Sequence, residues 1–404
     1  MKSGLGLALL VTMSAASAWA QQGARLSVED ALDLAAKQNL DLVAARARRA
    51  VSRAGVQIAR ERPNPTISFG ALRDSPHESL FIDQPLEIGG QRARRIAVAN
   101  QEGSLADVEI SALERQVRRN TREAYFQLSF AQAETERFQR VLELARRLEQ
   151  IARDRFAAGD VAQLEVIQAA LEVARAEADH KVAQQDEKVA LSQLNALLNE
   201  PAGTRWQLVD AVQDLPAAVE LPQLLQLAYS SNPELQHLAQ EQKVEQSRRS
   251  LLKAERIPNI DFEFGSDFNS PPDFQSGPRG QIALSIPLFA RNQGEIAQSL
   301  ASERQLDAAL AATKRSVAAG IETAFFDLGA QRTQAETYRD SLVPVASKLE
   351  ALAEESYRAG KADILTVLTA QRNVQDVEHN YLQSLLSVQS SYAGLEELVG
   401  APLK

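Results

Sequence analysis

The chain offers few residues at spacings that could support catalysis or metal binding. It contains no phosphate-binding glycine loop, no G-x-S-x-G nucleophile motif and no H-E-x-x-H zinc motif. The acid pairs at 354–355 and 396–397 lie in stretches with helical periodicity, where solvated carboxylates are expected. The histidines have no second ligand at metal-binding spacing: His77, His180, His237 and His379. We therefore predict that the protein is not an enzyme and holds no cofactor or metal.

The composition excludes further classes of partner and fold. The 404-residue chain has a net charge of −9 at pH 7, which argues against a nucleic-acid partner. It contains no cysteine, so we expect no disulfide, no thiolate metal site and no acylated N-terminal cysteine. Hydrophobic residues make up 45% of the chain but aromatic residues only 5%, so Ala, Leu and Val supply most of the apolar surface. This balance favours helices that pack closely along their length.

Residues 1–20 have the features of a secretory signal peptide. Lys2 is the charged start, an apolar run includes Leu5 to Val11, and Ala18-Trp19-Ala20 is a small-x-small cleavage site. No later apolar run reaches the roughly 20 residues that a transmembrane helix needs. We expect an exported protein, with a short uncleaved anchor as the alternative.

A turn motif occurs twice and indicates an internal duplication. Phe156 and Gly159 in the first turn recur as Tyr357 and Gly360 in the second, and the flanking residues also match. Each glycine stands where the end of a helix favours a left-handed residue. The same sequence pattern therefore predicts two helical hairpins, each with a glycine turn at its tip.

The duplication divides the mature chain into two structural repeats. Each repeat combines helices, a β-hairpin and a long helical hairpin. The predicted boundaries are 21–205 for the first repeat, with strands at about 64–88 and a tip at 155–160, and 206–404 for the linker and second repeat, with strands at about 259–289 and a tip at 357–361.

The first helix of each hairpin is expected to be very long. No proline occurs between Pro85 and Pro201, and apolar residues keep three- and four-residue spacing. A helix from about Gly90 to Arg155 would extend roughly 100 Å at about 1.5 Å per residue. A globular domain of this size is far narrower, so the hairpins should project or form a tube. Pro344 should kink the last upward helix.

Each repeat also contains two short segments in which apolar and polar residues alternate. In the second repeat these are 260–264 and 281–288. In the first repeat, 66–71 alternates clearly, whereas the following strand is less regular because Phe81 and Asp83 share a face. The segments between the strands are rich in Pro, Asp, Ser and Gly and are predicted loops: residues 73–78 and 268–277.

Such alternation fits strands of a membrane-spanning barrel, although a small soluble sheet with one face on a core would look similar. A barrel in lipid cannot leave an edge unpaired, and the smallest bacterial barrels have about eight strands. Four strands cannot close alone, whereas two chains would supply eight and three would supply twelve. If the strands lie in lipid, the sequence requires an oligomer.

The whole arrangement resembles the TolC-type outer-membrane efflux proteins, over essentially the entire mature chain. The most specific parts are the two tips and the proline-bearing strand ends. The segment from Gln84 to Arg92 is similar to that of the branch serving cobalt–zinc–cadmium and copper efflux pumps. The resemblance implies a mainly α fold with membrane β, in which three chains form a TolC-like α-barrel tunnel in the periplasm and one 12-stranded β-barrel in the cell outer membrane, with four strands per chain.

The resemblance also implies partners and site residues. The tips would dock on a periplasmic adaptor protein, which links the tunnel to an inner-membrane efflux pump, and the channel itself would be passive. Some relatives place acids just past the second tip to close the tunnel mouth, but Thr366 and Thr369 occupy those positions here. Asp363, one turn nearer the tip, and Glu165, past the first tip, are the predicted mouth-lining residues. The alternative is that both are ordinary solvated acids at a helix start. The implied docking residues are Arg155, Phe156, Gly159, Asp160, Tyr357, Gly360 and Lys361.

Three interpretations of the function follow. The first is a channel that exports heavy-metal cations. The second is the same type of channel for drugs, other small molecules or secreted cargo. The third belongs to another class, a soluble periplasmic coiled-coil adaptor or structural protein. An adaptor would normally carry one helical hairpin flanked by compact β domains, whereas this chain carries two hairpins and two amphipathic strand pairs.

Overall fold

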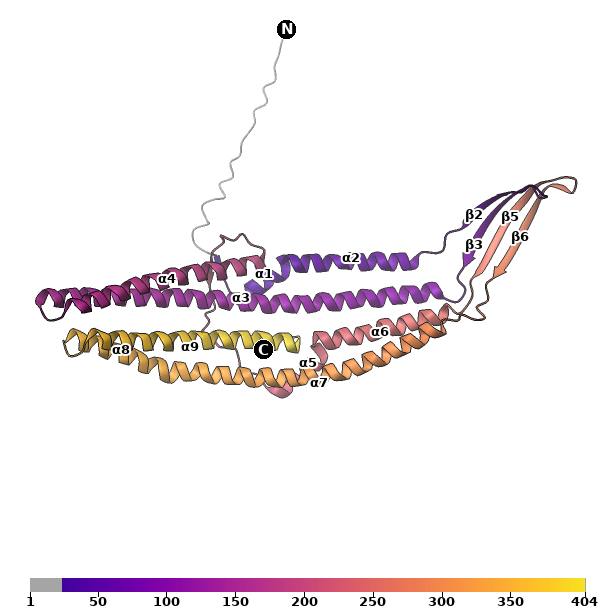
Figure 1. Ribbon diagram of the computed structural model, residues 1–404. Coiled ribbons are helices and arrows are strands. Elements are labelled where there is room, and N and C mark those ends of the chain that lie inside the picture. The colour runs from indigo at the N-terminus through magenta and orange to yellow at the C-terminus, as the bar shows by residue number, and fades with distance from the viewer. Residues whose placement is uncertain (1–23, 404) are drawn as a thin grey trace, which may run out of the picture. The chain divides into compact units, whose positions relative to one another are not determined.

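The structure is a computed structural model that describes residues 24–403 (Figure 1). The predicted signal peptide at 1–20 lies outside the described residues. Most of the described chain is helical, as the sequence predicts. In chain order the elements are β1 (Ala24–Leu26), α1 (Val28–Gln38), α2 (Leu40–Arg60), β2 (Thr66–Ala71), β3 (Glu78–Leu86), α3 (Gln91–Ala158), α4 (Gln163–Leu198), β4 (Trp206–Leu208), α5 (Leu221–Ser231), α6 (Pro233–Ala254), β5 (Ile260–Ser270), β6 (Phe274–Leu284), α7 (Gln293–Thr337), the π-helix η1 (Tyr338–Leu342), α8 (Val343–Arg358) and α9 (Ile364–Val399).

The chain forms two compact units, and both predicted repeats contribute segments to each. The tip unit contains the two glycine turns, and the sheet unit contains β2, β3, β5 and β6. None of the helices within residues 24–403 is both long enough and apolar enough to cross a bilayer. The described residues divide into 24–35, 121–215 and 334–389 for the tip unit and 36–120, 216–333 and 390–403 for the sheet unit.

Helix α3 is the long helix that the proline-free stretch predicts. It contains 68 residues and ends at Ala158, immediately before Gly159. Good helix formers such as Ala, Glu, Gln, Arg and Leu fill the positions between its apolar residues. The prediction of one uninterrupted helix across this stretch is confirmed.

The helices of the tip unit pack through narrow seams of small residues. In α4 the buried alanines recur with heptad spacing, which is the pattern of coiled-coil packing. One core cluster joins Ala169 to Leu148 of α3 and to Val367 of α9, and a second joins Ala176 to Leu142 and Ala145 of α3. Small side chains let the helix backbones approach closely, which explains how the fold forms with few aromatic residues. The heptad alanines are Ala169, Ala176, Ala183 and Ala190.

The sheet unit contains an antiparallel sheet with the strand order β2-β3-β5-β6. Strands β3 and β5 form its centre, where Glu78 pairs with Phe268 and Leu86 with Ile260. Strands β2 and β6 are its edges, and neither pairs on its outer side with another described strand. A separate parallel pair, β1 and β4, belongs to the tip unit.

Two predicted boundaries in the second strand pair are wrong. Strands β5 and β6 occupy most of the loop predicted at 268–277, so only residues 271–273 connect them. The strand predicted at 281–288 already ends at Leu284. Pro278, which directly follows the predicted loop, lies on an edge strand. A missing backbone donor is tolerated there because edge strands need not donate on both sides.

Pro344 disturbs its helix without breaking it. Helix α7 passes into the π-helix η1, and α8 starts at Val343. The N–H of Val343 donates to the carbonyl of Tyr338, five residues earlier. Because proline lacks an amide proton, one α-helical hydrogen bond is lost near this position. The wider π-helical turn accommodates the missing hydrogen bond. The kink predicted at Pro344 therefore takes the form of a π-helical turn.

Tyr125 of α3 fixes the β1–β4 pair to the helices of the tip unit. Its side chain is fully buried, and its hydroxyl donates to the carbonyl of Leu26 at 2.9 Å. The same oxygen accepts the N–H groups of Val209 and Asp210 at 3.2 and 3.0 Å. Burial raises the pKa of Tyr125 to about 12, so the hydroxyl remains a neutral donor and acceptor at physiological pH.

Replacing this hydroxyl should destabilise the tip unit. Tyr125→Phe leaves the amide of Asp210 without its partner, whereas the amide of Val209 still donates to the carbonyl of Leu26 at 3.0 Å. A buried unsatisfied group costs about 1–3 kcal/mol. The melting temperature of the purified protein in detergent should fall. Tyr229→Phe, which removes a hydroxyl from an exposed tyrosine of α5, is the matched control and should melt with the wild type. Equal melting temperatures for both variants would contradict this role of Tyr125.

Candidate functional site

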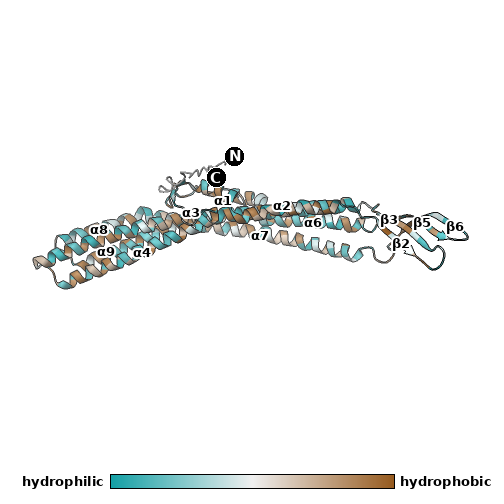
Figure 2. Ribbon diagram, turned by 90° about the horizontal axis from the view of Figure 1, so that it is seen from above, coloured by the Kyte–Doolittle hydropathy of each residue, from teal (hydrophilic) through white to brown (hydrophobic). Residues whose placement is uncertain are grey.

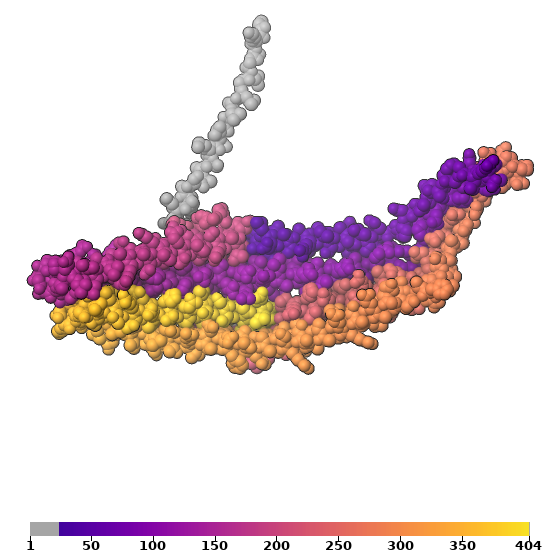
Figure 3. All heavy atoms as spheres, viewed as in Figure 1, coloured from indigo at the N-terminus to yellow at the C-terminus, as the bar shows by residue number. Residues whose placement is uncertain are grey.

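One face of the four-stranded sheet is apolar and open. The strand register places Ile67, Ile82, Phe264 and Leu80 on the same face as Ile282, and all of these side chains are exposed. Phe264 is 69% exposed. Within the sheet unit, helices α2, α6 and α7 do not cover the strands in Figures 1 and 2, and Figure 3 shows the same arrangement with all heavy atoms. An apolar surface of this kind requires another apolar phase or another protein to cover it.

The opposite face of the sheet is polar, and its charged residues are mostly acidic. Asp83 pairs directly with Glu263, and Phe81 lies on the same face, as its sequence pattern indicates. Like charges directly opposite each other are unfavourable in a sheet. Arg279 supplies a positive charge on this face, 3.8 Å from Asp267 and over the ring of Phe81. The sheet therefore separates a lipid-compatible face from a water-compatible one.

Both tips are closed by the same hydrogen-bond pattern. Gly159 and Gly360 have φ values of +84° and +71°. At each tip the residue after the glycine donates its N–H to a carbonyl five residues earlier: Asp160 to Arg155 at 2.9 Å, and Lys361 to Ser356 at 2.8 Å. This is the Schellman arrangement that ends a helix with a left-handed glycine.

Two charged residues of the first hairpin hold Tyr357 of the second. The guanidinium of Arg155 stacks over the Tyr357 ring at 4.9 Å and donates to its carbonyl at 3.3 Å. The Tyr357 hydroxyl donates to the carboxylate of Glu165 at 3.3 Å. Tyr357 is 0% exposed, and its burial, together with Glu165, raises its pKa. These three residues form a clasp that joins the two tips.

The predicted docking residues therefore fall into two groups. Phe156, Gly159, Asp160, Gly360 and Lys361 are exposed at the tips. Tyr357 is buried in the clasp, so it can act on a partner only by positioning the exposed residues, whereas Arg155 is in the clasp but partly exposed. Sequence comparison of the two turns did not reveal this difference, because Tyr357 occupies the position of the exposed Phe156.

The two predicted mouth residues also differ in their surroundings. Glu165 is engaged by Tyr357 in the clasp. Asp363 is exposed and caps the start of α9, where one of its oxygens accepts the hydroxyl and the N–H of Thr366 at 2.7 and 2.9 Å. The Thr366 hydroxyl lowers the pKa of Asp363, which therefore stays ionised at neutral pH. Both acids lie in the tip unit, one past each turn.

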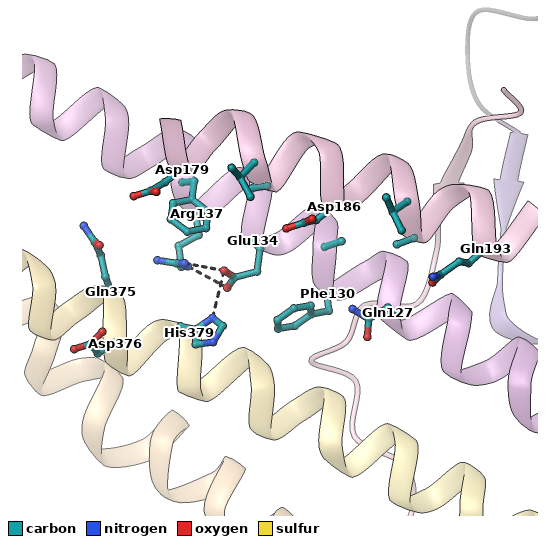
Figure 4. A pocket seen from close by; sticks show the side chains of 16 residues that line it. Gln127, Phe130, Glu134, Arg137, Asp179, Asp186, Gln193, Gln375, Asp376 and His379 are labelled. Carbon is teal, nitrogen blue, oxygen red and sulfur yellow. Dashed lines mark hydrogen bonds and ion pairs between the residues drawn. The ribbon is translucent and has the colours of Figure 1, made fainter. Parts of the chain in front are cut away.

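A hollow of about 920 Å³ lies between α3, α4 and α9 (Figure 4). Glu134 and Arg137 of α3 are buried at its wall and share hydrogen bonds of 3.0 and 2.7 Å. A ring nitrogen of His379 of α9 lies 3.4 Å from the same carboxylate. The sequence did not indicate this cluster, because His379 is distant along the chain. Within residues 24–403 no group of three or more His, Cys, Asp or Glu side chains could hold a metal ion.

Glu350 is a partly buried acid of α8. Burial raises its pKa, and nearby Glu378 and Glu354 act in the same direction, whereas Arg147 and Arg140 oppose the shift. A pKa above that of the unfolded chain means that protonation favours the folded state. The resulting stabilisation is present at acid pH and is lost as pH rises through the raised pKa.

The comparisons with known proteins identify the family. The model of the outer membrane efflux protein family matches residues 31–200 and 224–401. The chain belongs to the outer membrane efflux protein family. Each of the two matched segments of this efflux protein contains one pair of sheet strands and one tip.

Individual members of the family agree with this assignment. The efflux protein is 26% identical over 385 residues to the cobalt-zinc-cadmium resistance protein CzcC of Cupriavidus metallidurans, covering 93% of this chain and 90% of CzcC. Its fold matches CusC with a TM-score of 0.74 at 16% identity, covering 97% of this chain and 96% of CusC. It also matches VceC of Vibrio cholerae with a TM-score of 0.74 at 15% identity, covering 93% and 97%.

Substituting a tip glycine should loosen the turn without a steric clash. A Cβ at Gly159 meets no atom within 4 Å, so Gly159→Val acts through its positive φ, which costs a non-glycine residue about 1–2 kcal/mol. Hydrogen exchange of the amides at 155–165 should become faster. Gly320→Ala, at a helical glycine with open space, is the control and should leave this exchange unchanged. Unaltered exchange in Gly159→Val would show that the turn tolerates a side chain.

Removing the charge of Glu350 should stabilise the tip unit at neutral pH. Glu350→Gln should melt at a higher temperature than the wild type at pH 7.5, and the difference should shrink as pH falls, because the wild-type carboxyl becomes protonated. Thermal melts between pH 4 and 8 would measure this. Glu355→Gln, at an exposed acid of the same helix, should show no comparable gain. A gain independent of pH would contradict the electrostatic explanation.

Proposed function

We propose that three copies of the chain form a passive channel in the cell outer membrane. Their twelve strands close into one β-barrel, and their helices form a tunnel in the periplasm. The channel serves a tripartite efflux system in which a periplasmic adaptor links it to an inner-membrane pump. The observation that carries this proposal is the four-stranded sheet, with one exposed apolar face and two unpaired edges.

The unpaired edge strands of the sheet favour assembly of several copies of the chain. Strands β2 and β6 run antiparallel to each other, because the sheet contains four strands that alternate in direction. The β6 edge of one copy can therefore pair with the β2 edge of the next in the same antiparallel sense. A repeated contact between two different surfaces closes into a ring. Three chains then give a barrel with its apolar face toward lipid and its acidic face toward the lumen.

The tips supply the surface for the adaptor. Phe156, Asp160 and Lys361 are exposed, and the clasp of Arg155, Tyr357 and Glu165 holds the two turns in a fixed relation. In this proposal Glu165 and Asp363 line the tunnel mouth, with Glu165 also serving the clasp. Each of the two repeats, 21–205 and 206–404, contributes one strand pair and one tip to the proposed channel.

The proposed cargo is heavy-metal cations. The support is the similarity to CzcC, whose name links it to cobalt, zinc and cadmium resistance. The acidic face of the sheet is compatible with cations, since carboxylates raise the local concentration of positive charge. Energy for export comes from the pump, so the channel needs no catalytic residues of its own.

The architecture can be tested by membrane fractionation followed by particle analysis in detergent. We expect the chain in the outer-membrane fraction, as a long hollow particle of three copies. A soluble monomer or dimer would contradict both the barrel and the trimer, and would favour a periplasmic adaptor or structural protein instead.

The cargo can be tested by deleting the gene in a strain without a redundant channel. Tolerance of zinc, cobalt, cadmium and copper should fall, whereas tolerance of dyes and antibiotics should not change. Restoring the wild-type gene should restore metal tolerance. Unchanged metal tolerance with reduced dye or antibiotic tolerance would replace metal cations by small organic molecules as the cargo.

A further inference from the structure

The segment between β6 and α7 exposes large apolar side chains at the end of the sheet. It comprises residues 285–292 and joins the end of β6 to the start of α7 (Figure 1). Ile286 and Leu288 are exposed, and Phe289 is 91% exposed, more than any other large hydrophobic residue within 24–403. Isolated exposed apolar residues are common, but three in one short segment form a patch.

Hydrogen bonds hold this segment in one conformation. The side chain of Gln293 donates to the carbonyl of Phe289 at 3.0 Å and accepts the N–H of Arg291 at 2.7 Å. The Nε of Arg291 donates to the carbonyl of Pro287 at 3.0 Å. The side chain of Asn292 donates to the carbonyl of Leu252 in α6 at 3.2 Å. The turn is thus fixed to its neighbouring helix while Phe289 is held outward.

Two arginines lie beside the apolar residues. Arg256 and Arg291 line one hollow of about 560 Å³ together with Leu288 and Phe289. Neither arginine forms an ion pair with a described acid, and the terminal nitrogens of both guanidinium groups have no hydrogen-bond partner within 24–403. The hollow therefore combines an apolar wall with two positive groups that could bind an anion.

The patch continues the open face of the sheet. Ile282 and Leu284 belong to that face in β6, and Ile286 and Leu288 follow them directly in the chain. In the proposed channel this face meets the acyl chains of the membrane, so residues 285–292 lie where the bilayer ends on the periplasmic side. Phosphate groups of phospholipids are the anions at that level, and Phe and Leu side chains of interfacial segments insert at the boundary between headgroups and acyl chains.

We propose that residues 285–292 and Arg256 form a phospholipid-binding foot. Phe289 and Leu288 insert among the acyl chains of the periplasmic leaflet, and Arg256 and Arg291 bind the phosphate of an anionic phospholipid. The inference rests on the proposed outer-membrane channel. It assigns a ligand class and a set of binding residues that barrel closure does not require.

Insertion of Phe289 can be measured by fluorescence quenching. Single tryptophans are introduced as Phe289→Trp, Phe264→Trp and Phe326→Trp in a Trp19→Phe, Trp206→Phe background, because the chain has two natural tryptophans. Each protein is reconstituted in vesicles of phosphatidylcholine and phosphatidylglycerol with brominated acyl chains. Phe326 is an exposed residue of α7 and serves as the control outside the bilayer. We expect strong quenching at 289 and 264, and little at 326.

The outcomes distinguish failure of the proposed phospholipid-binding foot from failure of the proposed channel. Quenching at 264 without quenching at 289 would overturn the foot and leave the barrel intact, with another protein surface covering Phe289. Absence of quenching at both 264 and 289 would contradict the membrane location of the sheet itself.

Recognition of the headgroup can be measured by native mass spectrometry in detergent. Phosphatidylglycerol should remain bound to the wild type, whereas phosphatidylcholine and inorganic phosphate should be lost. The double variant Arg256→Gln, Arg291→Gln should retain at least tenfold less phosphatidylglycerol. The control Arg304→Gln, Arg315→Gln removes the same charge from exposed positions of α7 and should bind like the wild type. Equal retention by the two double variants would overturn the role of Arg256 and Arg291.

Discussion

The unpaired edges of the four-stranded sheet are the constraint on which the rest of the molecule depends. Strands β2 and β6 each present a row of backbone N–H and C=O groups on their outer side. In water such an edge invites aggregation, and in lipid each unpaired group costs several kcal/mol. The exposed apolar face makes water an unsuitable surrounding. Pairing between copies gives the backbone groups of both edges hydrogen-bond partners, and lipid covers the apolar face.

The helical part follows a different rule, which is close packing by small residues. The heptad alanines of α4 let neighbouring helices approach along their length. The chain thereby builds long helices without a large aromatic core. Aromatic and charged residues are used instead at particular positions, such as Tyr125 at the β1–β4 pair and Tyr357 in the clasp. The tips are consequently defined by a few specific contacts, which a partner could recognise or disturb.

Much of the fold could be predicted from the sequence, because its signals are local. The absence of proline and the helical spacing of apolar residues predict α3, and alternation predicts the strands of the sheet. The start of β6 could not be predicted, because Pro278 is acceptable only on an edge strand and strand order is not a local property. The clasp was missed for a similar reason. Equivalent positions in the two turns, Phe156 and Tyr357, have opposite burial, and only the packing of one hairpin against the other decides this.

Pairing between the sheet edges of neighbouring copies is tested most directly by disulfide cross-linking of β2 to β6. The natural chain has no cysteine, so Ser68→Cys in β2 can be combined in turn with Arg279→Cys, Gln281→Cys or Ala283→Cys in β6. These positions share one face of the sheet, and a disulfide requires Cα atoms within about 7 Å. If the copies pair edge to edge, oxidation of outer membranes links them into dimers and trimers for at least one pair, while each single-cysteine variant forms no trimer. Monomers alone for all three pairs would contradict this pairing.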